Sequence, residues 1–135
     1  MIFIDTTIWV SGIDASDRLH KDGKAVLEAL VEGRIPPALT TDSVLDESLT
    51  LLKRRGANVE AIAEAMETII SSPLVRVDYV EEPTFRQTLS NFKKYEKLSF
   101  TDAVTLTIMN RYKIKEIYSH DGDFDLRGII RKERP

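Results

Sequence analysis

A helix that is apolar on nearly every side places the tightest limit on the fold of this 135-residue chain. We predict it over Thr101–Tyr112, where the apolar positions are Ala103, Val104, Leu106, Ile108, Met109 and Tyr112. A helix with apolar residues all round is buried inside a domain rather than laid on its surface. The rest of the chain is therefore expected to surround this helix.

One acidic residue, Asp102, lies on the same stripe of the helix as Leu106 and Met109, at i, i+4 and i+7. An ionised carboxylate that points inward is costly unless a cation or a hydrogen bond meets it. Ser99 and Asp102 have the S-x-x-D spacing of a capping box, so the acid could simply cap the helix. Alternatively, Asp102 is a metal ligand, which requires partner carboxylates from elsewhere in the chain.

The composition indicates a globular protein of one domain, residues 1–135, with 42% hydrophobic and 30% charged residues. No cysteine is present, which excludes disulfides and thiolate metal sites, and two histidines are too few for a zinc site. Neither a signal peptide nor a membrane span is visible, so we expect a cytoplasmic protein. The net charge of −3 argues against a protein that only coats nucleic acid, but not against an enzyme with an acidic metal site.

Short apolar strands alternate with helical segments along the chain. We predict strands over Ile2–Ile4, Ala38–Thr40, Leu74–Val80, Glu116–Ser119 and Ile129–Arg131. A first helix is predicted to begin at Thr6 or Thr7. Further helices are predicted over Lys21–Val31, Asp42–Arg55, Val59–Ile70 and Pro83–Tyr95, and loops over Gly12–Asp22 and His120–Gly128. This alternation is typical of an α/β domain with a central, mainly parallel β-sheet flanked by helices on both faces.

Acidic residues follow two of the predicted strands. Asp5 comes directly after the first strand and Asp121 follows Ile117-Tyr118-Ser119, and sites in open parallel sheets form beyond these carboxyl ends. Glu47 is predicted at the edge of the apolar face of its helix, whereas Asp46 faces solvent. Such carboxylates repel one another unless Mg²⁺ or Mn²⁺ lies between them.

Each acid also has a purely structural interpretation. Asp5 could cap the following helix, Glu47 could be a solvated residue, and the stretch 121–125 could be a polar turn. An EF-hand is excluded, because Leu126 replaces its glycine and Lys132 its closing glutamate. The aspartate phosphatases fit poorly, because Thr7 stands at the place of their second aspartate.

The order of four motifs resembles the PIN-domain ribonucleases over essentially the whole chain. These motifs are the strand ending in Asp5-Thr6, then Val44-Leu45-Asp46-Glu47, Leu98-Ser99-Phe100-Thr101-Asp102-Ala103 and Ser119-His120-Asp121-Gly122-Asp123-Phe124-Asp125. The chain is most similar to the small VapC-type toxins of toxin–antitoxin pairs. The resemblance implies a PIN-like α/β fold and an acidic pocket that binds Mg²⁺ or Mn²⁺ and hydrolyses phosphodiester bonds in RNA.

Residue by residue, the resemblance assigns the acidic catalytic and metal-binding positions to Asp5, Glu47, Asp102 and Asp121. It assigns small hydroxyl positions to Thr6 and Ser119, while Asp123 and Asp125 leave the identity of the fourth ligand open. Metal ions would activate the attacking water and neutralise charge on the phosphate, with Glu47 helping to orient the water. Candidate phosphate contacts are Lys53, Arg54, Arg55, Arg111, Lys113, Arg127, Arg131 and Lys132.

The resemblance also implies an antitoxin partner and a homodimer. Trp9 and the helix over Lys24–Val31 could form a groove for the antitoxin, or Trp9 could be a core aromatic residue. Two other functions stay open: a housekeeping PIN nuclease in RNA processing and a non-catalytic binding module with the same fold. Four intact acids speak against the second, because a binding module has no need of unpaired buried carboxylates.

Overall fold

A five-stranded parallel sheet forms the centre of the computed structural model, which describes residues 1–135. The strand order is β3-β2-β1-β4-β5, and each neighbouring pair is parallel. The strands are β1 (Ile2–Ile4), β2 (Ala38–Thr41), β3 (Val75–Asp78), β4 (Glu116–Tyr118) and β5 (Ile130–Lys132). The predicted parallel sheet is therefore confirmed, and the chain forms a single α/β domain.

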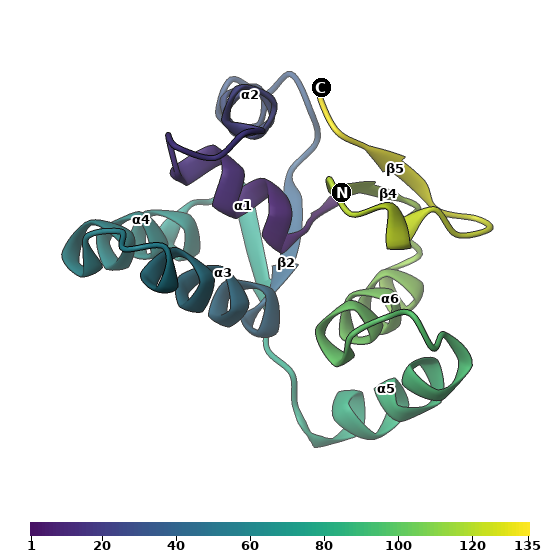
Figure 1. Cartoon of the computed structure of the whole chain (residues 1–135). Helices are drawn as coiled ribbons and strands as arrows, with labels where there is room; N and C mark the ends of the chain where they lie inside the picture. The colour runs from purple at the N-terminus through teal and green to yellow at the C-terminus, as the bar shows by residue number, and fades with distance from the viewer.

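Six helices and one 3₁₀ turn cover the two faces of this sheet (Figure 1). They are α1 (Thr6–Ile13), α2 (His20–Val31), α3 (Asp42–Arg54), α4 (Val59–Ser71), α5 (Glu82–Lys94), α6 (Phe100–Tyr112) and the turn η1 (Gly122–Phe124). Helices α1 to α4 lie on one face and α5 and α6 on the other. Right-handed crossovers explain this division, because the chain moves from β1 to β3 in one direction and then returns to β4.

The central position of β1 explains its apolar sequence. Ile2, Phe3 and Ile4 are all buried, since helices cover the strand on both faces. Trp9 on α1 is also buried in the main core, and its indole Nε1 donates to Thr40 Oγ1 at 3.3 Å. The interpretation of Trp9 as a core aromatic residue is thus confirmed.

Helix α6 is the buried helix that the sequence predicts. Every residue from Asp102 to Met109 is buried, and α5 packs along it. It begins at Phe100, one residue before the predicted start, because Ser99 caps it with its side chain. None of the helices is both long and apolar enough to cross a lipid bilayer.

The largest difference from the predicted elements is in the loop expected over Gly12–Asp22. Helix α1 extends to Ile13 and α2 starts at His20, so only a short turn separates them. The two helices pack closely at Gly23, where an added Cβ would lie 2.1 Å from Ser11 Oγ. The strand predicted over Leu74–Val80 is shorter, because only Val75–Asp78 pairs with β2.

Candidate active site

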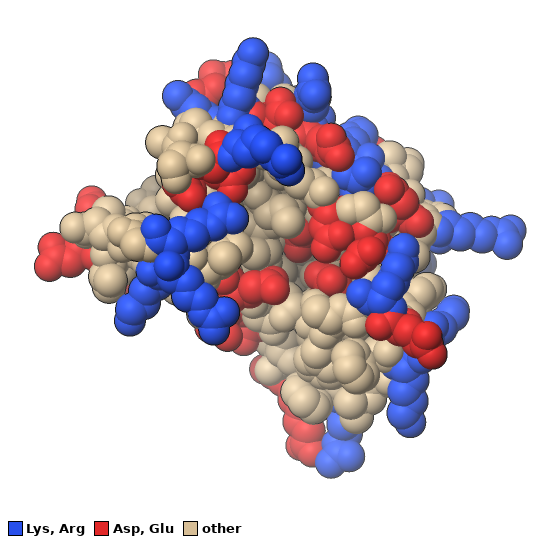
Figure 2. All heavy atoms as spheres, in the orientation of Figure 1, with Lys and Arg blue, Asp and Glu red and all other residues tan.

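Acidic side chains from three separate parts of the chain meet at the carboxyl end of the sheet. Asp5 follows β1, Asp121 lies just beyond β4, and Asp102 is in the first turn of α6. Strands β1 and β4 are hydrogen-bonded neighbours, which brings Asp5 towards Asp121 as the parallel sheet predicted. Figure 2 shows acidic atoms gathered near the middle of this face, with lysine and arginine side chains around them.

Asp5 is almost fully buried and strongly oriented. Its Oδ2 atom accepts hydrogen bonds from Ser119 Oγ at 2.8 Å, Thr7 Oγ1 at 3.0 Å and Thr7 N at 3.4 Å. The side chain therefore caps α1, as one interpretation of the sequence proposed. These three bonds all end on Oδ2. Burial raises the pKa of Asp5, and the hydrogen bond from Ser119 opposes that rise.

Asp102 combines the two roles that the sequence left open. Ser99 Oγ accepts from Asp102 N at 3.1 Å and Asp102 Oδ2 accepts from Ser99 N at 3.4 Å, which completes a capping box. Burial, followed by the charge of Asp5, raises the pKa of Asp102 to about 6, with a smaller contribution from Asp121. The charges of Asp5 and Asp121 therefore act on Asp102, so these three acids belong to one end of the sheet.

The third and fourth acids come from the segment after β4. Asp102, Asp121 and Asp123 each offer a carboxylate oxygen, and these oxygens lie within 4.8 Å of one another. Asp121 also caps η1 through its Oδ1 atom, which accepts from Asp123 N at 2.9 Å. Asp125 instead pairs with Arg131 at 2.8 Å and lies outside the group. Of the two residues that the sequence left undecided, Asp123 therefore lies with the other acids.

Glu47 reaches the site from α3 but is not part of the group of three. Its Oε2 atom accepts from Thr6 Oγ1 at 2.7 Å, and Thr6 directly follows Asp5 in the chain. Glu47 was predicted at the edge of the apolar face of its helix, and its side chain is more exposed to solvent than that position suggests. Asp46 is exposed as predicted and forms no hydrogen bond or ion pair with a side chain.

The donor atoms of this site fit a hard divalent cation. All of them are carboxylate or hydroxyl oxygens, which Mg²⁺ and Mn²⁺ prefer over nitrogen or sulfur ligands. Carboxylates this close repel one another in the absence of a cation. Burial is the main cause of the raised pKa of Asp102, and the charges of Asp5 and Asp121 add to it. The structure thus contains an acidic cluster suited to a metal ion, built from Asp102, Asp121 and Asp123 beside Asp5.

Half of the eight basic residues predicted to contact phosphate are paired within the protein. Four of them have partners: Arg55 (Asp14 and Asp17), Arg111 (Thr84 and Gln87), Arg131 (Asp125 and Glu133) and Lys132 (Glu116). The other four, Lys53, Arg54, Lys113 and Arg127, form no side-chain hydrogen bond or ion pair. A further basic residue, Arg18, was not predicted from the sequence and lines a pocket of about 610 Å³ beside the acids. Arg18 is exposed and lies in a polar loop, where no helix or strand periodicity in the sequence distinguishes one residue from another.

Comparison with known proteins agrees with this geometry. The PIN domain family model matches residues 2–129. The chain is 33% identical over 132 residues to the 23S rRNA-specific endonuclease VapC20 of Mycobacterium tuberculosis, which covers 96% of each chain. It is also 33% identical to a VapC ribonuclease of Archaeoglobus fulgidus, over 95% of this chain and 81% of that protein.

Solved structures share the fold. The crystal structure of M. tuberculosis VapC20, titled a sarcin–ricin loop cleaving toxin, superposes with a TM-score of 0.81 over 96% of this chain and 97% of that chain, at 32% identity. A toxin–antitoxin complex from Klebsiella pneumoniae has a TM-score of 0.66 at 16% identity and matches 96% of each chain. The same family assignment follows from the family model, which spans most of the chain, and from the relatives that match over nearly its full length. The carboxylate cluster at the end of the sheet agrees with it. The chain belongs to the PIN-domain family, and its relatives are VapC ribonucleases.

Proposed function

We propose that this protein is a metal-dependent endoribonuclease, the toxin of a toxin–antitoxin pair, with residues 1–135 as its PIN domain. The observation that carries the proposal is the meeting of Asp102, Asp121 and Asp123 within 4.8 Å, at the sheet end where Asp5 is also held. The 33% identity to named ribonucleases over nearly the whole chain supports it. An RNA substrate places the protein in the cytoplasm.

The catalytic residues in this proposal are Asp5, Glu47, Asp102 and Asp121, and Asp123 joins them as a further ligand. The metal ion, Mg²⁺ or Mn²⁺, would be held by Asp5, Asp102, Asp121 and Asp123. Glu47 would bind it directly or through a water molecule. A divalent ion at such a site lowers the pKa of bound water and neutralises charge on the phosphate oxygens. Ser119 and Thr7 fix the orientation of Asp5, so little further ordering of its side chain is needed for metal binding.

Glu47 has a different task from the other acids. Its carboxylate is exposed, and Thr6 fixes one of its two oxygens. The other oxygen is free to accept a hydrogen bond from the attacking water and to orient it towards phosphorus. Thr6 is therefore a positioning residue, because it acts on the water only through Glu47.

The first substrate to test is large-subunit ribosomal RNA. Its basis is the relative named a 23S rRNA-specific endonuclease, which matches 96% of this chain. A housekeeping nuclease of RNA processing is the alternative, and a short antitoxin reading frame beside the gene would favour the toxin. A non-catalytic binding module is disfavoured, because it would gain nothing from four carboxylates that repel one another.

Assembly with an antitoxin and as a homodimer completes the proposal. Helix α5 leaves three large apolar side chains at spacings of four and three residues partly open to solvent: Phe85 (50% exposed), Leu89 (42%) and Phe92 (44%). A row of this kind on one helix face is typical of a surface that a partner covers. Light scattering at tens of micromolar should give a dimer mass, or the antitoxin should co-purify; a strict monomer without a partner would count against the toxin.

The activity is tested with purified protein and ribosomal RNA, with Mg²⁺ or Mn²⁺ present and with EDTA. We expect cleavage only with the metal ion, and primer extension locates the cut. Asp5→Asn and Asp102→Asn should each lower the rate by about 10³-fold or more, because an amide keeps the shape but removes charge that the metal requires. Asp123→Asn should also be damaging, whereas Asp125→Asn, which breaks only a surface ion pair, should retain most of the activity. Full activity of Asp102→Asn, or no cleavage of any cellular RNA by wild type with Mn²⁺, would contradict the proposal.

A further inference from the structure

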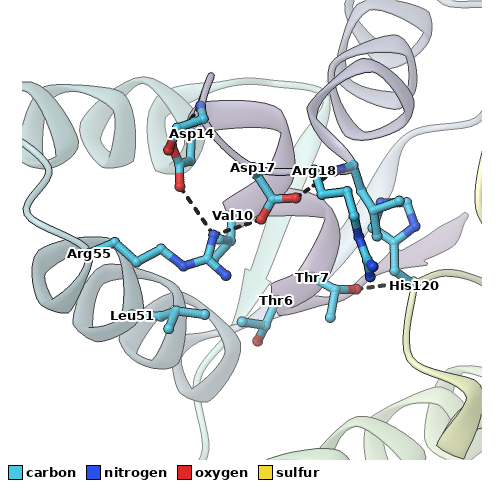
Figure 3. A pocket seen from close by; sticks show the side chains of 11 residues that line it. Thr6, Thr7, Val10, Asp14, Asp17, Arg18, Leu51, Arg55 and His120 are labelled. Carbon is cyan, nitrogen blue, oxygen red and sulfur yellow. Dashed lines mark hydrogen bonds and ion pairs between the residues drawn. The ribbon is translucent and has the colours of Figure 1, made fainter.

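A pocket of about 610 Å³ opens beside the acidic site, between α1, the turn over residues 14–19 and the last turn of α3 (Figure 3). It shares Thr6 and Thr7 with the site, since these residues hold Glu47 and Asp5. The pocket volume is within the range of small-molecule and nucleotide sites. Nothing in the catalytic proposal uses it.

Arg55 is fixed in one wall of this pocket by two carboxylates. Its Nη1 atom donates to Asp17 Oδ2 at 2.6 Å and to Asp14 Oδ2 at 3.1 Å (Figure 3). The other oxygens of the two acids are also occupied, because Asp14 Oδ1 accepts from Ser16 and Asp17 Oδ1 from Leu19 N. The acceptors of this wall are therefore used within the protein, while Nε and Nη2 of Arg55 keep their hydrogens free to donate.

Arg18 supplies a second group of free donors. It forms no hydrogen bond or ion pair with the protein, and it lines the same pocket as Thr7 and His120; Figure 3 shows its side chain extending towards these two residues. Arginine remains charged at every relevant pH and matches the geometry of phosphate oxygens. The polar groups still open in this pocket are thus mainly cationic donors, which suit a ligand rich in acceptors.

The remaining lining is apolar. Val10, Leu19 and Leu51 contribute hydrocarbon surface, and Figure 3 shows Val10 and Leu51 on the side of the pocket that Arg55 spans. Apolar surface next to arginine donors accommodates an unstacked nucleotide, with its base on the hydrocarbon and its phosphate on the guanidinium groups. Sequence-specific recognition of RNA usually targets nucleotides that are splayed out in this way.

We propose that this pocket holds a nucleotide of the RNA that flanks the scissile phosphate, with Arg18 and Arg55 contacting its backbone phosphate. The inference rests on the proposed ribonuclease function and adds a substrate subsite to it. A cluster of carboxylates repels RNA, so positive donors at its border offset that repulsion where the strand enters. Asp14 and Asp17 act as positioning residues, because they orient Arg55 and do not meet the RNA.

Two measurements test the subsite on the full chain. Fluorescence anisotropy follows binding of a fluorescein-labelled single-stranded RNA of mixed sequence in EDTA, where no cleavage occurs. Steady-state kinetics with metal ion then separates KM from kcat. Arg18→Gln should weaken binding and raise KM by about tenfold with little change in kcat, the size expected for loss of one charged hydrogen bond. The slope of log Kd against log salt should fall by about 0.7 for each phosphate contact that is removed.

Arg55 requires a more conservative substitution, because Arg55→Gln would also leave Asp14 and Asp17 without a cationic partner. Arg55→Lys keeps the charge and removes the free Nε and Nη2 donors, so it should raise KM without lowering the melting temperature. Arg86→Gln is the matched control: Arg86 lies on α5, pairs only with Glu82 and should change neither KM nor binding. Photo-crosslinking with 4-thiouridine RNA should label peptides within residues 6–19 or 51–55.

The outcomes separate the subsite from the ribonuclease proposal. If wild type cleaves RNA while Arg18→Gln and Arg55→Lys match it in KM and salt dependence, the subsite is wrong and the activity stands. If wild type cleaves nothing but Arg18→Gln loses RNA binding and the crosslinks fall in these peptides, the subsite stands and the activity is wrong. Crosslinks confined to other peptides, or no binding by wild type, would overturn the subsite.

Discussion

At the scale of single residues, Asp102 has the clearest measurable consequence. Its pKa of about 6 in the folded protein is above the ordinary value of 3.8, so between these values the native state binds a proton more tightly than the unfolded state. The stability that protonation gives is present below about pH 4 and is lost as the pH rises through about 6. At neutral pH the metal-free protein therefore carries a charged carboxyl that opposes folding.

We predict that Asp102→Asn stabilises the metal-free protein at pH 7.5. The gain should be on the order of 1 kcal/mol, because solvent at the open edge of the site screens part of the effect. That gain corresponds to a rise in melting temperature of about 2–5 °C for a chain of this size. The asparagine oxygen can still accept from Ser99 N, so the capping box remains.

The difference between Asp102→Asn and wild type should shrink as the pH is lowered towards 4, where the wild-type carboxyl is protonated. Heating scans in EDTA at several pH values measure this difference directly. Asp46→Asn is the control, since Asp46 is exposed, unpaired and outside the acidic cluster. A constant difference for Asp102→Asn across this range would mean that the carboxyl is not perturbed by its neighbours.

At the scale of elements, helix α3 offers a test of its rotational phase. Glu47 and Asp46 are consecutive and both exposed, yet only Glu47 points to the site, where it accepts from Thr6. Successive residues on a helix differ in direction by about 100°. The two positions therefore provide a matched pair with equal charge and similar exposure but different directions.

We predict that Glu47→Gln lowers kcat by about 100-fold or more, as loss of a general base does, while Asp46→Asn leaves it within about twofold. Thr6→Val should have a smaller effect in the same direction, because Glu47 then loses the hydrogen bond that positions it. Cleavage rates with saturating Mn²⁺ provide the comparison. Equal rates for the Asp46 and Glu47 variants would show that α3 does not place Glu47 in the catalytic machinery.

The elements themselves were largely predictable, whereas contacts between distant turns were not. The apolar run at Ile2–Ile4 predicts β1, and the helix that is apolar on all sides predicts α6. The position of Asp5 and Asp121 after strands predicts that both lie at the carboxyl end of the sheet. These features are predictable because they depend on periodic or local patterns in the sequence. The direction of Asp123 depends on η1, and the pocket around Arg18 depends on hydrogen bonds within residues 14–19. Such turns leave no periodic pattern, so only the folded chain shows which side chains they bring together.

At the scale of the whole molecule, the acidic cluster links metal binding to stability. An ion bound only by the native state stabilises it by RT ln(1 + [L]/Kd), about 1–3 kcal/mol when the ion is well above its Kd. We predict that the melting temperature in Mn²⁺ exceeds that in EDTA by about 3–10 °C for a domain of this size. The variant Asp102→Asn should lose most of this difference. An unchanged midpoint with no calorimetric binding would leave capping as the sole role of Asp102.

The pairing of the first and fourth strands has a consequence for how the protein is made. Asp5 Oδ2 accepts from Ser119 Oγ across 114 residues of chain, and β4 must lie beside β1 before that bond can form. Contacts of such high sequence separation form late in folding. During synthesis on the ribosome, Asp5 emerges first but has no complete site until almost the entire polypeptide has followed it. We therefore expect the nascent chain to be inactive, because a chain that stops before Ser119 lacks Ser119, Asp121 and Asp123 of the proposed site.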